Sequence, residues 1–276
     1  MKFFKFLLLV SFLYLNACNN AVKENETEKN SATNPVIKEE NVTYGSDSAK
    51  LTGFVAYDTN SQAKRPVVLV IHEWWGLNEY VKERSKQLAK MGYLAMAVDM
   101  YGDGKMGNNP DEAGKLATPF YTNPALAKSR FDAALEKIKT YPQADTAQIA
   151  AIGYCFGGAM VLNMARLGAK LNGVVSFHGN LAGVPTDKNL LKAAVLVCHG
   201  AADPFVKPEE VTSFKKQMDS IGANYTFKTY EGALHAFTNP AATAMGEKFK
   251  IPIAYNAAAD TASWKDMKEF FGKIFK

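Results

Sequence analysis

The sequence predicts an α/β fold in which a mostly parallel central sheet is covered by helices on both faces. Short apolar runs, such as residues 67–72 and 194–198, alternate along the chain with longer amphipathic stretches such as residues 124–140. Continuous apolar runs are typical of strands buried on both faces. Strands that alternate with helices in this way indicate a parallel sheet with helices on either side.

The individual elements follow from hydrophobic period and capping residues. Residues 51–57 alternate and predict an edge strand, whereas residues 67–72 predict a buried strand. Asn78 is a preferred capping residue and precedes a helical pattern over 79–91. Further strands are expected at 93–98, 147–152, 173–177, 194–198 and 225–230, helices at 124–140, 159–167, 208–221 and 261–275, and a long loop over the Gly-, Asn- and Asp-rich residues 101–114.

Composition fits one globular domain and argues against one class of partner. The 276 residues are 47% hydrophobic and 21% charged, and no interior linker or repeat divides them. The net charge of +5 is not gathered in a Lys/Arg run, and aromatic residues do not interleave with a basic patch. Nucleic-acid binding is therefore not expected. The oligomeric state is left open.

The N-terminus predicts an export signal. Lys2 and Lys5 precede an apolar stretch at residues 6–15, and Ala17 and Cys18 follow it. This order is typical of a secretory signal peptide, and the apolar stretch is short for a transmembrane helix. Two outcomes fit the pattern: lipoprotein processing, or ordinary secretion with cleavage near Ala17.

Lipid attachment at Cys18 is the favoured outcome. The tetrapeptide Leu-Asn-Ala-Cys at 15–18 resembles a bacterial lipobox, and the polar segment behind it has the composition of a tether. We therefore expect a signal peptide over 1–17, a lipidated linker over 18–44 and the folded domain over 45–276. The protein would be a bacterial lipoprotein, exported and held on a membrane through Cys18, facing the periplasm or the cell surface.

The strongest chemical signal is the hexapeptide Gly-Tyr-Cys-Phe-Gly-Gly at 153–158. It follows an apolar run and opens a helical pattern, which is the strand–turn–helix context of a nucleophile elbow centred on Cys155. Glycines flank such a turn because the backbone passes close to itself and to the helix. A thiol is a strong nucleophile whose ionisation proteins tune. Taken alone, a small buried cysteine in a Gly-rich turn explains the hexapeptide equally well.

Two further residues supply the partners that a nucleophile needs. Asp203 and His235 each lie in a loop after an expected strand. The chain order of nucleophile, acid and histidine is that of α/β hydrolases, so we expect an α/β-hydrolase fold with a Cys155–His235–Asp203 triad. The backbone N–H groups of Phe156 and Trp74 are expected to form the oxyanion hole.

The third cysteine has a structural explanation. Cys198 lies inside an apolar run and is expected to pack there. A bridge from Cys198 to Cys155 would disable the expected nucleophile, and two cysteines in a chain with a full core do not indicate a disulfide scaffold.

From Leu51 to the C-terminus the chain resembles the dienelactone hydrolase family of α/β hydrolases. The resemblance is carried by Ile-His-Glu-Trp-Trp-Gly-Leu at 71–77, Asp-Met-Tyr-Gly at 99–102, the hexapeptide at 153–158, His199-Gly200 with Asp203, and His235-Ala236-Phe237. The first and third of these motifs are together specific to the family.

The resemblance implies further site residues. Glu73 matches the family's glutamate that hydrogen-bonds the cysteine and takes its proton when substrate arrives. A partly buried carboxylate has the raised pKa that this role needs. Trp75, Tyr101 and Lys105 are expected to contact the substrate, although the two neighbouring tryptophans fit equally well as packing beneath the loop. His72, which precedes this loop, is expected to orient it. No cofactor and no metal are expected.

His178 and His199 lie at strand ends, and both are expected to have structural roles.

One departure from the family bears on the substrate. Family members that act on dienelactone carry arginines that clamp its carboxylate, one after the Asp-x-Tyr motif and one shortly after the histidine. Residues 99–105 and 235–240 contain no Arg here, and Lys105 is only a point charge. We therefore expect an uncharged ester or lactone as substrate. The alternatives are a cell-surface esterase that removes acyl groups from sugars, and a non-catalytic lipid-anchored binding protein of the same fold.

Overall fold

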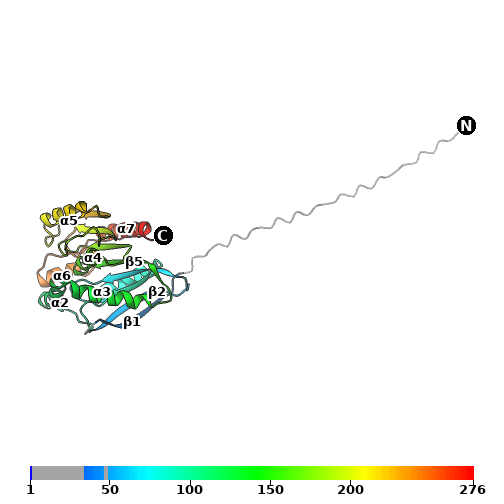
Figure 1. Ribbon diagram of the computed structural model, residues 1–276, viewed down its shortest axis with the longest axis horizontal. Coiled ribbons are helices and arrows are strands. Elements are labelled where there is room, and N and C mark those ends of the chain that lie inside the picture. The colour runs from blue at the N-terminus through cyan, green and yellow to red at the C-terminus, as the bar shows by residue number, and fades with distance from the viewer. Residues whose placement is uncertain (2–33, 47–48) are drawn as a thin grey trace. The chain divides into compact units, whose positions relative to one another are not determined.

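An eight-stranded sheet organises the described part of the chain (Figure 1). The computed structural model describes Met1 and residues 34–46 and 49–276. The strand order is β1-β2-β4-β3-β5-β6-β7-β8, with β3 to β8 parallel and β2 antiparallel to both neighbours. The strands are β1 (Ile37–Ser46), β2 (Ala49–Asp58), β3 (Arg65–Ile71), β4 (Leu94–Val98), β5 (Ala144–Tyr154), β6 (Gly173–Phe177), β7 (Ala194–Gly200) and β8 (Tyr225–Tyr230).

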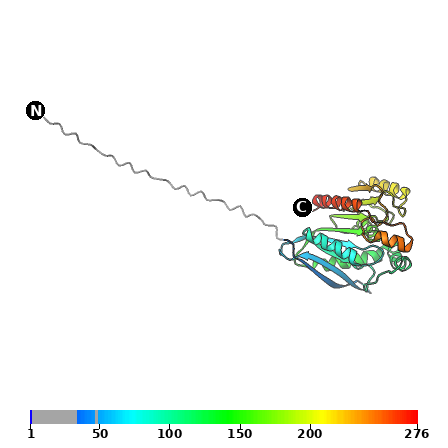
Figure 2. The same ribbon diagram turned by 180° about the vertical axis from the view of Figure 1, so that it is seen from behind.

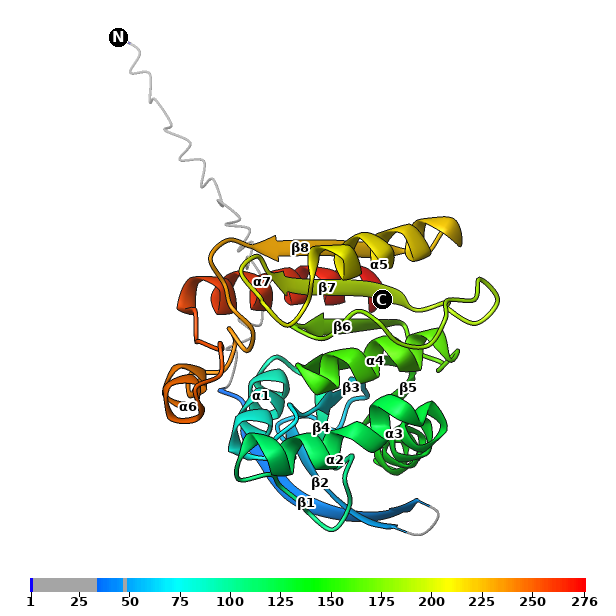
Figure 3. The ribbon, with the colours of Figure 1, turned by 90° about the vertical axis from the view of Figure 1, so that its left-hand side faces the viewer.

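Helices cover both faces of this sheet, as the sequence predicts. They are α1 (Glu79–Lys90), α2 (Pro110–Thr122), α3 (Pro124–Lys139), α4 (Phe156–Arg166), α5 (Pro208–Ser220), α6 (Ala242–Phe249) and α7 (Ala257–Ile274). Figure 3 shows α3, α4 and α5 in front of the sheet and α7 behind it, and Figure 2 shows the domain from behind. Residues of α1 and α7 share one apolar cluster, and residues of α2 to α5 share another.

The continuous apolar pattern of β3 reflects these two layers. Val67, Leu69 and Ile71 pack into the cluster of α2 to α5, while Val68 and Val70 pack into the cluster of α1 and α7. Successive side chains point to opposite faces of a strand, so a strand covered on both sides needs apolar residues at every position.

The folded unit begins earlier than the sequence analysis places it. Residues 37–44, assigned there to the linker, belong to β1, which pairs with the whole of β2. The predicted edge strand at 51–57 is therefore an inner strand, and β1 is the edge. Among residues 37–45 of β1, only Val42 and Tyr44 are buried, at 8% exposure each, so the strand needs few apolar residues and its composition resembles that of a tether. The predicted signal peptide and Cys18 lie outside the described residues.

Helices α2 and α6 were not predicted. The expected loop over 101–114 ends at Asn109, whose side chain accepts a hydrogen bond from the Glu112 N–H and caps α2. Pro110 then occupies the first turn, where a missing N–H costs nothing. Asn78 precedes α1 but its side chain makes no capping hydrogen bond, contrary to prediction. No helix of the described residues is long and apolar enough to span a bilayer.

Candidate active site

Cys155 sits in a sharp turn between β5 and α4. Its backbone has φ +53° and ψ −113°, a conformation that side-chain-bearing residues rarely adopt. A Cβ on Gly153 would lie 2.1 Å from the Gly157 carbonyl oxygen, and one on Gly157 would lie 2.3 Å from that of Ile71. Both glycines are therefore required for the turn. Cys155 precedes the first residue of α4, where the helix dipole favours a negative charge.

Asp203 and His235 meet beside this turn. His235 Nδ1 lies 2.8 Å from Asp203 Oδ2, and the other carboxylate oxygen accepts a hydrogen bond from the Phe205 N–H at 2.8 Å. Asp203 follows β7 and His235 lies in the loop after β8. Both side chains are buried, at 7% and 6% exposure. The Asp203 carboxylate thus fixes the orientation of the imidazole.

The charge state of His235 is set by its two neighbours. Burial lowers its pKa, but the charge of Cys155 and hydrogen bonds to Asp203 and Cys155 outweigh it and raise the pKa to about 10. An imidazole with so high a pKa is protonated at neutral pH. A charged imidazole beside Cys155 is the kind of neighbour that activates a cysteine nucleophile.

Glu73 lines the same cavity, and the pKa of its carboxyl group is raised. Burial raises its pKa, and a hydrogen bond from Asn239 together with the charges of His235 and Arg84 offsets part of this, leaving a pKa of about 7. Asn239 Nδ2 donates to Glu73 Oε2 at 2.7 Å, and Asn239 Oδ1 accepts from the Ala241 N–H at 3.0 Å. Glu73 therefore exchanges its proton near neutral pH. No role of Asn239 was predicted from the sequence.

The two expected oxyanion donors have free N–H groups. Phe156 is the first residue of α4, and helices provide no internal acceptor for such an N–H. Among the described residues neither the Phe156 N–H nor the Trp74 N–H has a protein acceptor. The Trp74 carbonyl accepts a hydrogen bond from the Tyr101 hydroxyl at 2.8 Å, which fixes the loop.

His72 ties this loop to α4. Its Nδ1 lies 2.5 Å from the Glu73 carbonyl oxygen and therefore carries the proton, while its Nε2 faces the Met100 N–H at 3.4 Å. The Gly157 N–H donates to the His72 carbonyl at 3.0 Å. Burial lowers the pKa of His72 to about 4, so the ring stays neutral. This geometry matches the orienting role considered for His72.

A second buried histidine connects the nucleophile turn to the loop of His235. The Cys155 N–H is shared between the Phe177 carbonyl, at 3.0 Å, and His178 Nδ1, at 3.1 Å. His178 Nε2 then lies 2.7 Å from Thr238 Oγ1. Burial, with the charges of His235 and Arg84, holds the pKa of His178 well below its usual range. His178 is thus a neutral link between two loops.

A buried ion pair supports this loop from behind. Arg84 of α1 donates to the Thr238 carbonyl at 2.6 Å and to Asp260 Oδ1 of α7 at 2.5 Å. The guanidinium also lies over the ring of Trp264, 5.1 Å from its centroid. These contacts hold the segment that carries His235 and Asn239 against two helices of one face.

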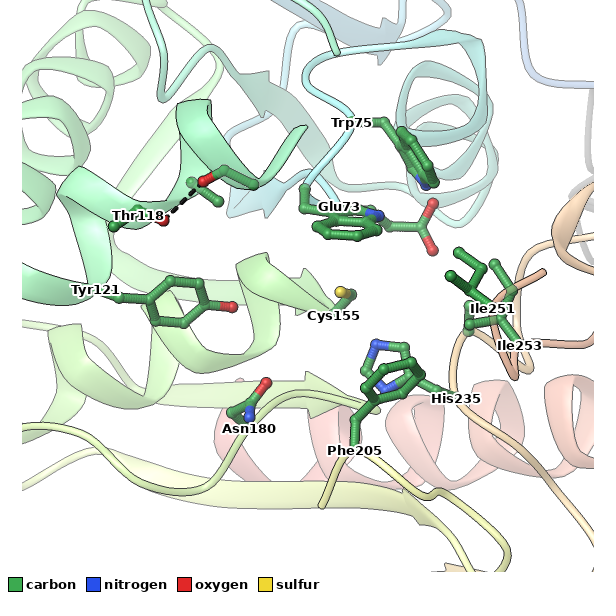
Figure 4. Close-up of a pocket in the computed structure, with 14 residues that line it drawn as sticks. Glu73, Trp75, Thr118, Tyr121, Cys155, Asn180, Phe205, His235, Ile251 and Ile253 are labelled. Atoms are coloured by element: carbon green, nitrogen blue, oxygen red, sulfur yellow. Dashed lines mark hydrogen bonds between the residues drawn. The ribbon is translucent and has the colours of Figure 1, made fainter. Parts of the chain in front are cut away.

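These groups line a cavity of about 310 Å³ (Figure 4). Figure 4 shows Cys155 at its centre, between Glu73 and His235. The lining residues are Glu73, Trp74, Trp75, Gly114, Ala117, Thr118, Tyr121, Cys155, Asn180, Phe205, His235, Ala236, Ile251 and Ile253. None of these is Lys or Arg.

Two of the expected substrate contacts lie elsewhere. Tyr101 is buried behind the wall, where its ring packs edge-on against His72 with centroids 4.7 Å apart. Lys105 is 55% exposed and pairs with Asp103 at 3.3 Å. The loop after β4 turns this side chain to solvent, so the expectation that Lys105 contacts the substrate is corrected. Trp75 does line the cavity, and it also stacks on Phe249.

Cys198 and His199 are not among the residues that line this cavity. Cys198 is fully buried in β7, and burial raises the pKa of its thiol to about 12. His199 ends β7 and packs against Phe227, with centroids 5.6 Å apart. Within the described residues, no group of three or more His, Cys, Asp or Glu side chains is arranged to hold a metal ion.

Comparison with known proteins identifies the family. The family model of the dienelactone hydrolases matches residues 51–275. A protein named usf from Aquifex pyrophilus is 30% identical over 203 residues, covering 72% of this chain and 86% of its own. A dienelactone hydrolase-like promiscuous phosphotriesterase from metagenomic libraries superimposes with a TM-score of 0.81 at 32% identity, covering 87% of this chain and 99% of its own. The protein m3DLH superimposes with a TM-score of 0.82 at 33% identity, again covering 87% of this chain and 99% of its own.

The fold and these matches define an α/β hydrolase. The chain belongs to the dienelactone hydrolase family and is an enzyme that hydrolyses esters or lactones. The alternative of a non-catalytic binding protein is therefore set aside.

Proposed function

We propose that the protein hydrolyses uncharged carboxylic esters or lactones through Cys155, with His235 and Asp203 as its partners. One observation carries the proposal. A thiol at a helix N-terminus, a carboxylate-bound imidazole and a buried glutamate line one cavity, and none of the described residues that line it is Lys or Arg. The thiol, the imidazole and the glutamate together suit acyl transfer. The lack of a Lys or Arg beside the imidazole argues against a substrate bound through a carboxylate, since a buried anion needs a partner.

The reaction then follows ordinary acyl-transfer chemistry. The Cys155 thiolate attacks the carbonyl carbon and forms a C–S bond, and the oxygen takes up the electron pair of the C=O bond. The N–H groups of Phe156 and Trp74 are the proposed donors to this oxyanion. When the oxyanion collapses, the C–O bond to the alcohol breaks and the His235 imidazolium gives its proton to the departing oxygen. Water, deprotonated by His235, then attacks the thioester and releases the acid and the thiolate.

Glu73 is proposed as a second proton acceptor for the thiol. Its pKa of about 7 lets it hold or release a proton at working pH, and it shares the cavity with Cys155. A proton on Glu73 instead of His235 would leave the imidazole free to act as a base.

The proposed substrate class includes acyl esters of sugars, because a sugar carries no formal charge. Export and anchoring through Cys18 are proposed together with it. The support is the order of basic residues, apolar stretch and Leu-Asn-Ala-Cys at residues 2–18. A lipid on Cys18 would hold the enzyme at the membrane surface, facing the periplasm or the exterior.

The test is the hydrolysis of p-nitrophenyl acetate and butyrate by the purified protein and by Cys155→Ala and Cys155→Ser. We expect no acyl-enzyme by intact mass in the alanine variant. The serine variant should lose at least about a hundredfold in kcat/KM, because its hydroxyl is not ionised by the same partners. Circular dichroism checks the fold. Near-wild-type activity in Cys155→Ala would overturn the assignment.

A further inference from the structure

One end of the cavity presents two polar groups without protein partners. They are the hydroxyl of Tyr121, near the end of α2, and the amide of Asn180, in the loop after β6. Within the described residues neither group makes a hydrogen bond to the protein. Figure 4 shows both side chains on the side of Cys155 that faces away from Ile251 and Ile253. A substrate that covers these groups without bonding them would leave them unsatisfied, at a cost in free energy.

A third polar side chain at this end is already engaged. Thr118 also lines this end, but its hydroxyl already donates to the Gly114 carbonyl at 2.7 Å, the dashed line in Figure 4. The opposite side of Cys155 carries the apolar side chains of Ile251 and Ile253, together with Glu73 and His235. The end with Tyr121 and Asn180 is therefore polar but uncharged, whereas the opposite side combines apolar side chains with the titratable groups Glu73 and His235.

The chemistry decides which part of the substrate meets which end. The departing oxygen takes its proton from His235, so the alcohol part must lie beside that ring. Phe205 packs edge-on against His235, with centroids 5.1 Å apart, and Figure 4 shows Ile251 and Ile253 on the same side. The acyl part extends the opposite way, toward Tyr121 and Asn180.

The Tyr121 ring is held in place for this role. It packs edge-on against Phe156, the residue after the nucleophile, with centroids 5.5 Å apart. A phenol is neutral at physiological pH and both donates and accepts, as does an amide. A hydroxyl or carbonyl substituent satisfies such a pair, whereas a carboxylate would lack a cationic partner.

We propose that Tyr121 and Asn180 determine specificity for short acyl groups that carry an uncharged hydroxyl or carbonyl substituent. This inference rests on the proposed ester hydrolysis and names its acyl class. A cavity of about 310 Å³ is at the small end for ligand sites, which suits a short chain.

A pair of esters with the same leaving group tests the proposal. Each enantiomer of p-nitrophenyl 3-hydroxybutanoate is compared with p-nitrophenyl 3-methylbutanoate, which replaces the hydroxyl by a methyl group. For the wild type we expect kcat/KM about tenfold higher for the preferred hydroxy ester, the scale of one net hydrogen bond. Tyr121→Phe and Asn180→Leu should each reduce this ratio, and the double variant should reduce it to one or below. Thr118→Val, at the same end, should keep the ratio.

The outcomes separate this inference from the reaction itself. Hydrolysis of both esters with a wild-type ratio of one or less, or a ratio unchanged in both single variants, would overturn the acyl specificity alone. If the protein hydrolyses neither ester, the proposed function is overturned and the specificity with it. A ratio that falls equally in Thr118→Val would also overturn the specificity, because the effect would then not depend on the two unpartnered groups.

Discussion

The side-chain amide of Asn239 donates a hydrogen bond to Glu73 over 2.7 Å, and this contact joins the loop after β8 to the loop after β3. Both residues are nearly fully buried. The bond stabilises the charged carboxylate in a site that otherwise disfavours it. Asn239 therefore lowers the pH at which Glu73 changes its proton occupancy, against the effect of burial, which raises it.

The first prediction is that Asn239→Leu raises the pKa of Glu73 above its value of about 7. A hydrogen bond to a charged group contributes about 1.5–3 kcal/mol, which corresponds to a shift of roughly one to two pH units. If Glu73 acts as a base, the acidic limb of the kcat/KM profile should move to higher pH, with activity recovering in alkaline buffer. In Glu73→Gln that limb should be absent. An unshifted limb in Asn239→Leu would contradict the role of this bond.

The second prediction concerns the thiolate and needs no substrate. Asp203 raises the pKa of His235 through its hydrogen bond and charge. Asp203→Asn should therefore lower that pKa and reduce the fraction of imidazolium–thiolate pair. Alkylation of Cys155 by iodoacetamide should slow at neutral pH, and its pH dependence should move upward. Cys198 is buried and provides an internal control by peptide mass mapping. Equal alkylation rates in variant and wild type would show that Asp203 does not support the thiolate.

The main elements and the nucleophile turn follow from local sequence. The parallel strands are continuous apolar runs because helices cover both faces, and the turn at Cys155 requires glycines where Cβ atoms would collide with backbone. Such signals are visible within a few residues. They explain why the fold class and the turn at Cys155 were predicted.

The errors arise where tertiary contacts decide the outcome. Strand β1 has few buried residues and depends on pairing with β2, so its polar sequence suggested a linker. Asn239 gains its role from Glu73, which lies 166 positions away along the chain. Lys105 follows a motif that suggested substrate contact, yet the loop geometry turns it outward to Asp103.

The third prediction concerns the anchor. Cys18→Ala should abolish incorporation of labelled fatty acid and shift the protein from the membrane pellet to the soluble fraction. The reason is that this cysteine is the expected acceptor of the lipid, and the neighbouring polar segment binds membranes poorly by itself. Cys198→Ala serves as the matched control and should remain labelled and membrane-bound. Labelling of Cys18→Ala at the wild-type level would refute lipid attachment at this position.

The last prediction concerns the ion pair behind the active site. The side chains of Arg84 and Asp260 are only 7% and 15% exposed. Arg84 also donates to the carbonyl of Thr238, the residue before Asn239. Arg84→Met leaves the Asp260 carboxylate without its cation, and breaking a buried pair in this way typically costs about 3–5 kcal/mol. The double variant Arg84→Met/Asp260→Asn removes both charges and should recover part of the free energy of unfolding, measured by urea denaturation. It should not recover kcat/KM, because the Thr238 carbonyl still lacks its donor and the loop of His235 is no longer held. Full recovery of kcat/KM in the double variant would show that Arg84 acts on stability alone.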